Sequence, residues 1–178
     1  MSLTELLVGR SADDQGAAAR RNVEQASLDE LLDALDLEPL GEWALLHITY
    51  ELTRRGAEII APIAARLVAC PTRPAAYGLS ESLTELFRDA PDARIVRALI
   101  EAGEAALRVG AGSRGAGTYV VHLADCALLA ERPLPEARTL ALAYLEVARG
   151  EAEPYNFGVD QAAFLADGKP GGASGDSQ

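Results

Sequence analysis

The segment that decides the fold is Asp89-Ala90-Pro91-Asp92-Ala93-Arg94-Ile95-Val96-Arg97-Ala98, part of which returns later in the chain. Residues 91–94 read Pro-Asp-Ala-Arg, and residues 135–138 read Pro-Glu-Ala-Arg, which is a spacing of 44. Proline suits the first helical position because its missing N–H would have no partner there, and a carboxylate beside it favours the positive end of the helix dipole. Each tetrad therefore predicts the start of a helix.

Outward from these tetrads, apolar residues recur at helical spacing, and no segment alternates with a period of two between hairpin turns. Ser27 and Glu30 form a capping-box pattern before one helix, and Pro71 and Pro74 end another. The expected helices, about seven in all, cover residues 27–35, 42–55, 57–70, 75–89, 91–108, 119–131 and 135–149, with a last turn or two at 159–165. The sequence therefore predicts an all-α protein.

Residues 89–98 resemble the acidic turn and the Val-Arg-x-Ala opening of the second helix in HEAT-type repeats, which span about 40 to 47 residues. The resemblance covers three helix pairs at residues 42–70, 75–108 and 116–150, whose spacing is uneven. It implies a helix-pair stack, that is, a HEAT-like or armadillo-like α-solenoid. Members of that family mostly present a curved surface to another macromolecule, and the resemblance assigns no role to a single residue.

Composition changes near both ends of the chain. Residues 10–21 are small and polar, and residues 168–178 are almost entirely Gly, Ser, Pro, Asp and Lys, which bury too little apolar surface to offset their ordering entropy. We expect a mobile segment over residues 1–23, a single helical domain over residues 24–167, and a disordered tail over residues 168–178.

The net charge narrows the choice of partners. The chain has 27 acidic and 16 basic residues, a formal charge of −11, and no basic run, so it repels phosphate backbones and favours a protein partner with a basic surface over a nucleic acid. No stretch approaches the ~18 apolar residues of a membrane span. Two cysteines are too few for a disulfide framework, and no signal-peptide pattern is present, so we expect a cytoplasmic protein.

Residues 24–42 carry seven acidic side chains and neither Lys nor Arg. This segment either steers a basic partner to the protein or forms the solvated face of a terminal repeat. The residues that we predict for partner binding in this segment are Asp29, Glu30, Asp33 and Asp36.

Four aromatic residues fall near the predicted helix pairs: Trp43, Tyr50, Tyr77 and Tyr119. Aromatic side chains dominate the energetics of interfaces, so these four are candidate anchors for a partner in a solenoid groove. Packing in the core is the alternative for each of them.

The glycine-rich stretch from Gly110 to Gly117 contains the G-x-G-x-x-G spacing of a dinucleotide-binding turn. That motif requires a preceding strand, whereas residues 92–108 have a helical pattern. The stretch is better interpreted as a flexible loop between helix pairs, and we predict no cofactor.

The chain has only two histidines, His47 and His122. Asp125 could orient His122 as a base, and Cys126 could complete half of a metal site with it. A histidine on an apolar helix is more often a packed structural residue, and no second ligand cluster appears, so we predict no metal site and favour a non-enzymatic role.

The leading hypothesis is a protein-binding module, an adaptor or an inhibitor of the immunity type that neutralises a basic toxin or nuclease. The alternative is a small-molecule-binding protein or enzyme whose pocket forms around His47 and His122. A third interpretation, an oligomerising helical domain, requires a large apolar surface patch. The sequence assigns no oligomeric state.

Overall fold

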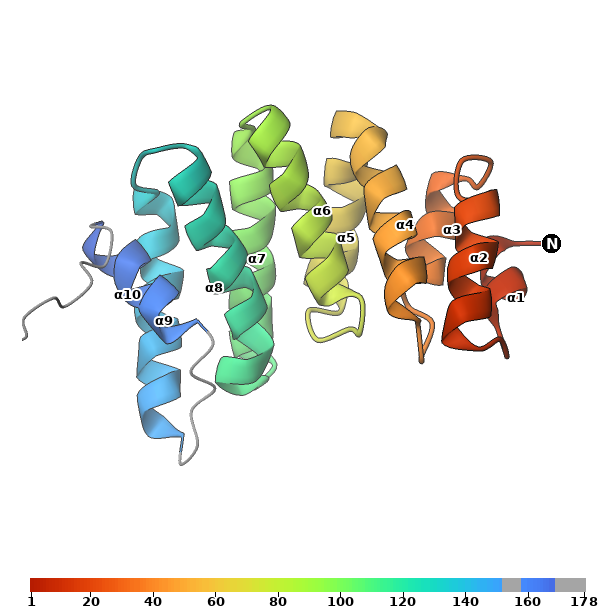
Figure 1. The fold of residues 1–178 in the computed structure, drawn as a ribbon. Helices are drawn as coiled ribbons and strands as arrows, with labels where there is room; N and C mark the ends of the chain where they lie inside the picture. Colours follow the sequence, from red (N-terminus) through yellow and green to blue (C-terminus); the bar gives the residue numbers. More distant parts are fainter. Residues whose placement is uncertain (152–157, 169–178) are drawn as a thin grey trace, which may run out of the picture. The chain divides into compact units, whose positions relative to one another are not determined.

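A computed structural model describes residues 1–151 and 158–168, so residues 152–157 and most of the expected tail lie outside the described residues. The chain divides into two compact units, unit 1 (residues 1–86) and unit 2 (residues 87–178). All regular structure in the described residues is helical, with ten α-helices and two 3₁₀-helices (Figure 1). The prediction of an all-α protein is confirmed, although the structure has more helices than the seven or so expected.

Unit 1 contains α1 (Leu3–Leu7), α2 (Ala12–Asn22), α3 (Leu28–Ala34), α4 (Glu42–Arg54), η1 (Gly56–Ile59), α5 (Ile60–Ala69) and most of α6 (Ala76–Asp89). Unit 2 contains the last residues of α6, then α7 (Ala93–Arg108), α8 (Gly112–Leu129), η2 (Pro135–Ala137), α9 (Arg138–Gly150) and α10 (Val159–Asp167). No helix of the described chain is both long enough and apolar enough to cross a bilayer.

The first 23 residues, which we expected to be mobile, form α1 and α2. Ser2 and Ser11 cap these helices, and Leu3 and Leu7 bury their side chains. Small residues look like a linker in a sequence, but in α2 they permit close packing. A Cβ at Gly16 would lie 2.7 Å from the Cβ of Trp43, so α2 approaches α4 at a distance that only glycine allows.

A second glycine brings α6 close to the other side of α4. A Cβ at Gly78 would lie 2.8 Å from Cδ1 of Leu45 and 3.3 Å from Cγ2 of Thr49. Helix α4 therefore lies between α2 and α6 within unit 1 (Figure 1). Its inner residues Ile48 and Leu52 are fully buried, which leaves its opposite face exposed to solvent.

Unit 2 is built around α8, which packs against α7, α9 and α10. Tyr119 and Leu123 of α8 are fully buried. Gly103 of α7 faces them closely, because a Cβ there would lie 2.6 Å from Cδ2 of Leu140 on α9 and 3.2 Å from Cβ of Tyr119. Glycine thus sets the helix spacing in both units.

The two proline tetrads start their helices differently. Pro135 is the first residue of η2, as the tetrad predicts. Helix α7 begins only at Ala93, because the carboxylate of Asp92 accepts a hydrogen bond from the backbone N–H of Arg94 and so makes Asp92 the N-cap. The predicted start at Pro91 was therefore two residues too early.

Candidate functional site

Two aspartates of the acidic segment of unit 1, Asp33 and Asp36, are paired with arginines of the same chain. Arg66 of α5 lies 2.5 Å from the carboxylate of Asp33 and 3.4 Å from that of Asp36, and Arg73 lies 3.0 Å from Asp36. These arginines come from more than 29 residues further along the chain, so the local sequence does not reveal them. The charge of Asp33 and Asp36 is therefore offset where the fold brings α3 and α5 together.

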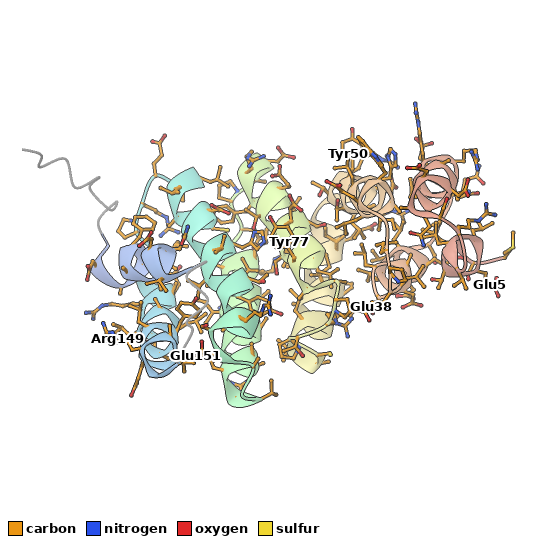
Figure 2. The ribbon with its side chains drawn as sticks, turned by 60° about the horizontal axis from the view of Figure 1, so that its bottom comes forward. Glu5, Glu38, Tyr50, Tyr77, Arg149 and Glu151 are labelled. Atoms are coloured by element: carbon orange, nitrogen blue, oxygen red, sulfur yellow. The ribbon has the colours of Figure 1, made fainter. Side chains whose placement is uncertain are left out.

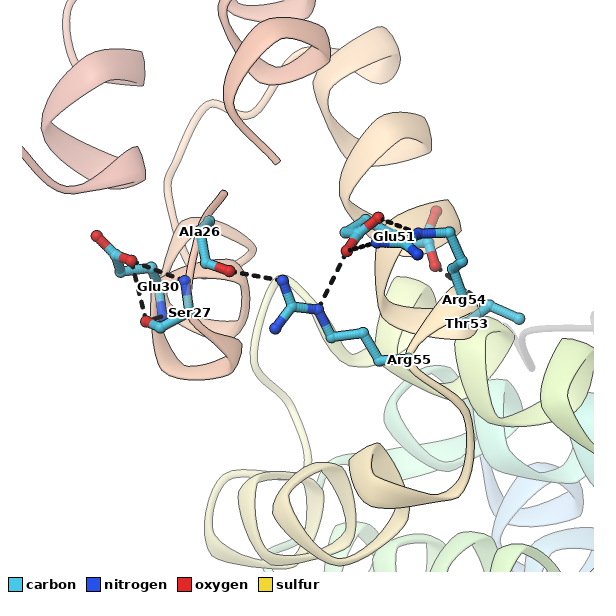
Figure 3. A network of polar contacts seen from close by, with 8 residues as sticks. Ala26, Ser27, Glu30, Glu51, Thr53, Arg54 and Arg55 are labelled. Atoms are coloured by element: carbon cyan, nitrogen blue, oxygen red, sulfur yellow. Dashed lines mark hydrogen bonds and ion pairs between the residues drawn. The ribbon is translucent and has the colours of Figure 1, made fainter. Parts of the chain in front are cut away.

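Glu30 also has a partner inside the chain. Its side chain accepts a hydrogen bond from the backbone N–H of Ser27 at 2.8 Å, while the Ser27 hydroxyl accepts one from the backbone of Glu30, so the predicted capping box is confirmed (Figure 3). The hydrogen bond from the Ser27 backbone N–H, assisted by one from the Ser27 hydroxyl at 3.0 Å, holds the pKa of the Glu30 carboxyl below its ordinary value. Asp29, on the same turn, is exposed.

An ion-pair network of Glu51, Arg54 and Arg55 lies at the end of α4. Glu51 is buried and accepts hydrogen bonds from Arg54 at 2.7 and 2.9 Å and from Arg55 at 3.1 Å, while Arg55 also donates to the carbonyl of Ala26 at 2.6 Å (Figure 3). The hydrogen bonds from Arg54, assisted by those from Arg55, lower the pKa of Glu51. This network connects α4 to the segment before α3 and occupies two arginines of unit 1.

The exposed face of α4 carries large apolar side chains. Trp43, Leu46 and Tyr50 follow one another at helical spacing, so they lie on one side of the helix, with exposed fractions of 60%, 52% and 71%. Tyr77 of α6 is 47% exposed and lines a hollow together with Trp43 and Leu46. Figure 2 labels Tyr50 on α4 and Tyr77 on α6. We call Trp43, Leu46, Tyr50 and Tyr77 the aromatic face.

Tyr119, the fourth aromatic residue that we predicted as a partner anchor, is not part of this face. Its side chain is fully buried in unit 2, where it packs near Gly103. Helical spacing in the sequence did not separate Tyr119 from the other three, because aromatic residues serve cores and interfaces alike.

Two hollows flank Trp43, and their charges differ. The first, of about 330 Å³, is lined by two carboxylates and two aromatic rings among its seven residues: Glu42, Trp43, Leu45, Leu46, Thr49, Tyr77 and Glu81. The second, of about 420 Å³, lies toward α2 and is lined by Asp13, Gly16, Ala17, Arg20, Arg21, Trp43 and His47. We call them the acidic hollow and the basic hollow.

Glu81 in the acidic hollow is a perturbed carboxylate. Partial burial raises its pKa, and the neighbouring Glu85 raises the pKa further. Both effects disfavour the charged form and would be reversed by a cation placed nearby. The acidic hollow is therefore suited to a positively charged group.

The two histidines fall in different units. His47, half-buried, lines the basic hollow with Arg20 and Arg21. His122 is 4% exposed on α8, and burial lowers its pKa to about 4. The carboxylate of Asp125 lies 4.0 Å from Nδ1 of His122 but is 48% exposed, so water weakens its attraction for a proton there.

The buried environment of His122 affects its candidate role as a general base. A general base works best with a pKa near the working pH, and the pKa of His122 lies well below neutrality. In the described part of the chain, no group of three or more His, Cys, Asp or Glu side chains is placed to hold a metal ion.

The glycine-rich stretch forms the beginning of α8. Helix α8 starts at Gly112, seven residues before the predicted start at residue 119, and follows α7 with no strand in the described residues. The Glu151 side chain accepts hydrogen bonds from the backbone N–H of Ser113, at 2.8 Å, and from the Ser113 hydroxyl. The bond from the Ser113 hydroxyl, assisted by the one from its backbone N–H, lowers the pKa of Glu151, and the carboxylate lies at the N-terminus of α8, where the helix dipole favours negative charge.

Comparisons with models of known families, with curated proteins and with solved structures give no match. The fold and the surface therefore describe this protein: it is all-helical in its described residues, and unit 1 carries the aromatic face. Trp43, Tyr50 and Tyr77, which the sequence suggested as partner anchors, are exposed. Leu46 was not suggested by the sequence, because its exposure depends on which side of α4 faces the core.

Proposed function

We propose that the protein is a binding module that holds another protein against the aromatic face of unit 1. The observation that carries this proposal is the exposure of Trp43, Leu46 and Tyr50 along one side of α4. Exposed Trp and Tyr side chains cost solvation free energy unless they are covered, and these two residue types are enriched where interfaces bind most strongly.

The charge of unit 1 supports a basic partner. Residues 1–86 contain 14 acidic and 7 basic residues, a net charge of −7, which attracts a positive surface and accelerates its encounter. Asp29 remains available for this steering role, whereas Glu30, Asp33 and Asp36 have partners inside the chain. The binding free energy therefore comes chiefly from the aromatic face, and the acidic residues contribute to the association rate.

The helix pairs support a HEAT-like solenoid as the architecture behind this function. Along the chain, α4 is followed by η1 and α5, α6 by α7, and α8 by η2 and α9, an order that is compatible with the three expected pairs. In solenoids of this kind, successive helices of one layer together form the surface that binds a partner. Adaptors and inhibitors of the immunity type are both compatible with such a surface.

The proposal is tested with a partner identified by affinity purification and then produced in pure form. Isothermal titration measures its Kd for the native chain, for Trp43→Ala combined with Tyr50→Ala, and for the matched control Leu142→Ala, an exposed apolar residue of unit 2. We expect the double substitution to weaken binding at least about 30-fold, the effect of one interface hot spot of about 2 kcal/mol, and the control to change Kd less than about twofold. Equal Kd values for all three chains, each with native circular dichroism, would refute the proposal.

The alternative of a small-molecule site has one supporting feature, the basic hollow with His47, Arg20 and Arg21. These cationic groups suit an anionic ligand. The expected shared pocket with His122 gains no support from the deep burial of that side chain. A titration with inorganic phosphate that shifts the His47 ring resonances at micromolar concentration would favour this alternative.

A further inference from the structure

We propose that the acidic hollow receives an arginine side chain of the partner protein, with its guanidinium against Trp43 and Tyr77 and paired with Glu42 and Glu81. The inference rests on the proposed function, because it names the group that the partner inserts into the aromatic face. It assigns a ligand of defined chemistry to the acidic hollow beside the aromatic face.

The aromatic rings provide the first requirement. Trp43 from α4 and Tyr77 from α6 both line the hollow, and the faces of such rings attract cations, most strongly in the case of tryptophan. Leu45 and Leu46 give the same hollow an apolar wall. An arginine matches this combination because its methylene stem packs on apolar surface while its head remains charged.

The carboxylates provide the second requirement. Glu42 and Glu81 come from different helices, and no basic residue is among the seven that line the hollow. Some other carboxylates of unit 1 pair with arginines of the same chain: Glu51 pairs with Arg54 and Arg55, and Asp36 with Arg66 and Arg73. Within the described residues, neither Glu42 nor Glu81 forms such an ion pair, so both carboxylates can accept a cation supplied by a partner.

The arrangement favours arginine over lysine. A guanidinium is planar, stacks on aromatic rings and donates hydrogen bonds in two directions at once, whereas an ammonium is a compact and strongly hydrated charge. Two carboxylates on two helices beside two rings offer acceptors and stacking surfaces together. A partner's arginine thereby gains ion pairing, hydrogen bonding and ring contact in one hollow.

Trp43 is the only tryptophan of the chain, so its indole N–H gives a single resonance. Trp43 lines both hollows, so this resonance reports on ligand binding beside the ring, and the Glu81→Gln variant assigns a shift to the acidic hollow. The full chain is titrated with N-acetyl-arginine amide and, as a neutral probe of nearly the same shape, with N-acetyl-citrulline amide. We expect saturable shifts with the arginine probe at millimolar concentration and at least tenfold weaker binding of the citrulline probe. Lysine amide should bind at least threefold more weakly than the arginine probe.

Variants locate the effect. Glu81→Gln should weaken the arginine probe about fivefold or more, while the matched control Glu58→Gln, which removes an exposed carboxylate of η1, should leave its binding unchanged. Equal binding of arginine and citrulline probes, or a Glu81→Gln chain that binds the arginine probe as the native chain does, overturns the inference.

Partner binding that is lost with Trp43→Ala and Tyr50→Ala but unaffected by Glu81→Gln also overturns the inference and leaves the proposed function standing. Partner binding insensitive to the Trp43 and Tyr50 substitutions refutes the proposed function itself.

Discussion

The imidazole of His122 shows what burial does to a single titratable group. Its pKa is lowered to about 4 by burial within unit 2, so the folded chain keeps it neutral where the unfolded chain, with an ordinary value of 6.5, takes up a proton. The contribution of His122 to stability is therefore complete above pH 6.5 and is lost as the pH falls toward 4. The lowered pKa that keeps the buried His122 ring neutral also makes the ring a poor base at neutral pH.

We predict that the native chain loses about 2 kcal/mol more unfolding free energy between pH 7.5 and pH 5 than the variant His122→Gln. The figure follows from about 1.4 kcal/mol for each pH unit below 6.5. Urea unfolding at both pH values, followed by circular dichroism, measures the difference. Parallel losses in the two chains would show that His122 keeps an ordinary pKa in the fold.

At the scale of elements, glycines decide how closely helices approach. The Cβ that Gly16 lacks would lie 2.7 Å from the Cβ of Trp43, an atom next to the backbone that cannot turn away. Gly16→Ala should therefore push α2 from α4 and lower the unfolding free energy by about 1 to 3 kcal/mol. It should also move the indole resonance of Trp43.

The matched control for this substitution is Gly150→Ala at the end of α9, where an added Cβ meets nothing within 4 Å. Alanine there should leave the unfolding free energy unchanged or raise it by up to about 1 kcal/mol, because it restricts the unfolded chain. If Gly16→Ala behaved like this control in thermal unfolding, the close contact between α2 and α4 would be wrong.

The helices differ in how well the sequence predicts them. Helical spacing gave α4, α6 and α9 within a few residues, because their apolar stripes are strong and proline or glycine residues flank them. It missed α2 and the beginning of α8, where Ala and Gly provide close packing without the large apolar side chains that mark a stripe. A residue such as Gly16 is interpreted as a linker until its neighbour Trp43 is known.

The candidate site was predictable only in part for a related reason. Residue type identified Trp43, Tyr50 and Tyr77 as interface candidates, but not which of the aromatic residues lie outside the core. The acidic residues Asp33 and Asp36 looked available because their partner Arg66 is distant in sequence. Long-range pairing of this kind is a property of the fold and is absent from any local pattern.

For the whole molecule, the two units are expected to respond separately to destabilisation. Contacts are concentrated within residues 1–86 and within residues 87–178, and the free energy of local opening differs between cooperative units of a protein. We predict that Gly103→Ala, which forces a Cβ to within 2.6 Å of Leu140, raises hydrogen exchange in α7, α8 and α9. The exchange of α2 and α4 should remain as in the native chain. Equal acceleration in all five helices would show one cooperative unit instead.

The central claim, that a protein partner binds at the aromatic face, is tested most directly by photo-crosslinking. A benzophenone side chain replaces Tyr50 on α4 in one chain and Val109, an exposed apolar residue of unit 2, in another, and each is irradiated with the partner. We expect a crosslinked heterodimer from position 50 and none from position 109, with the position-50 product reduced by Trp43→Ala. A crosslink from position 109 alone, or only a homodimer of the chain from position 50, would contradict it.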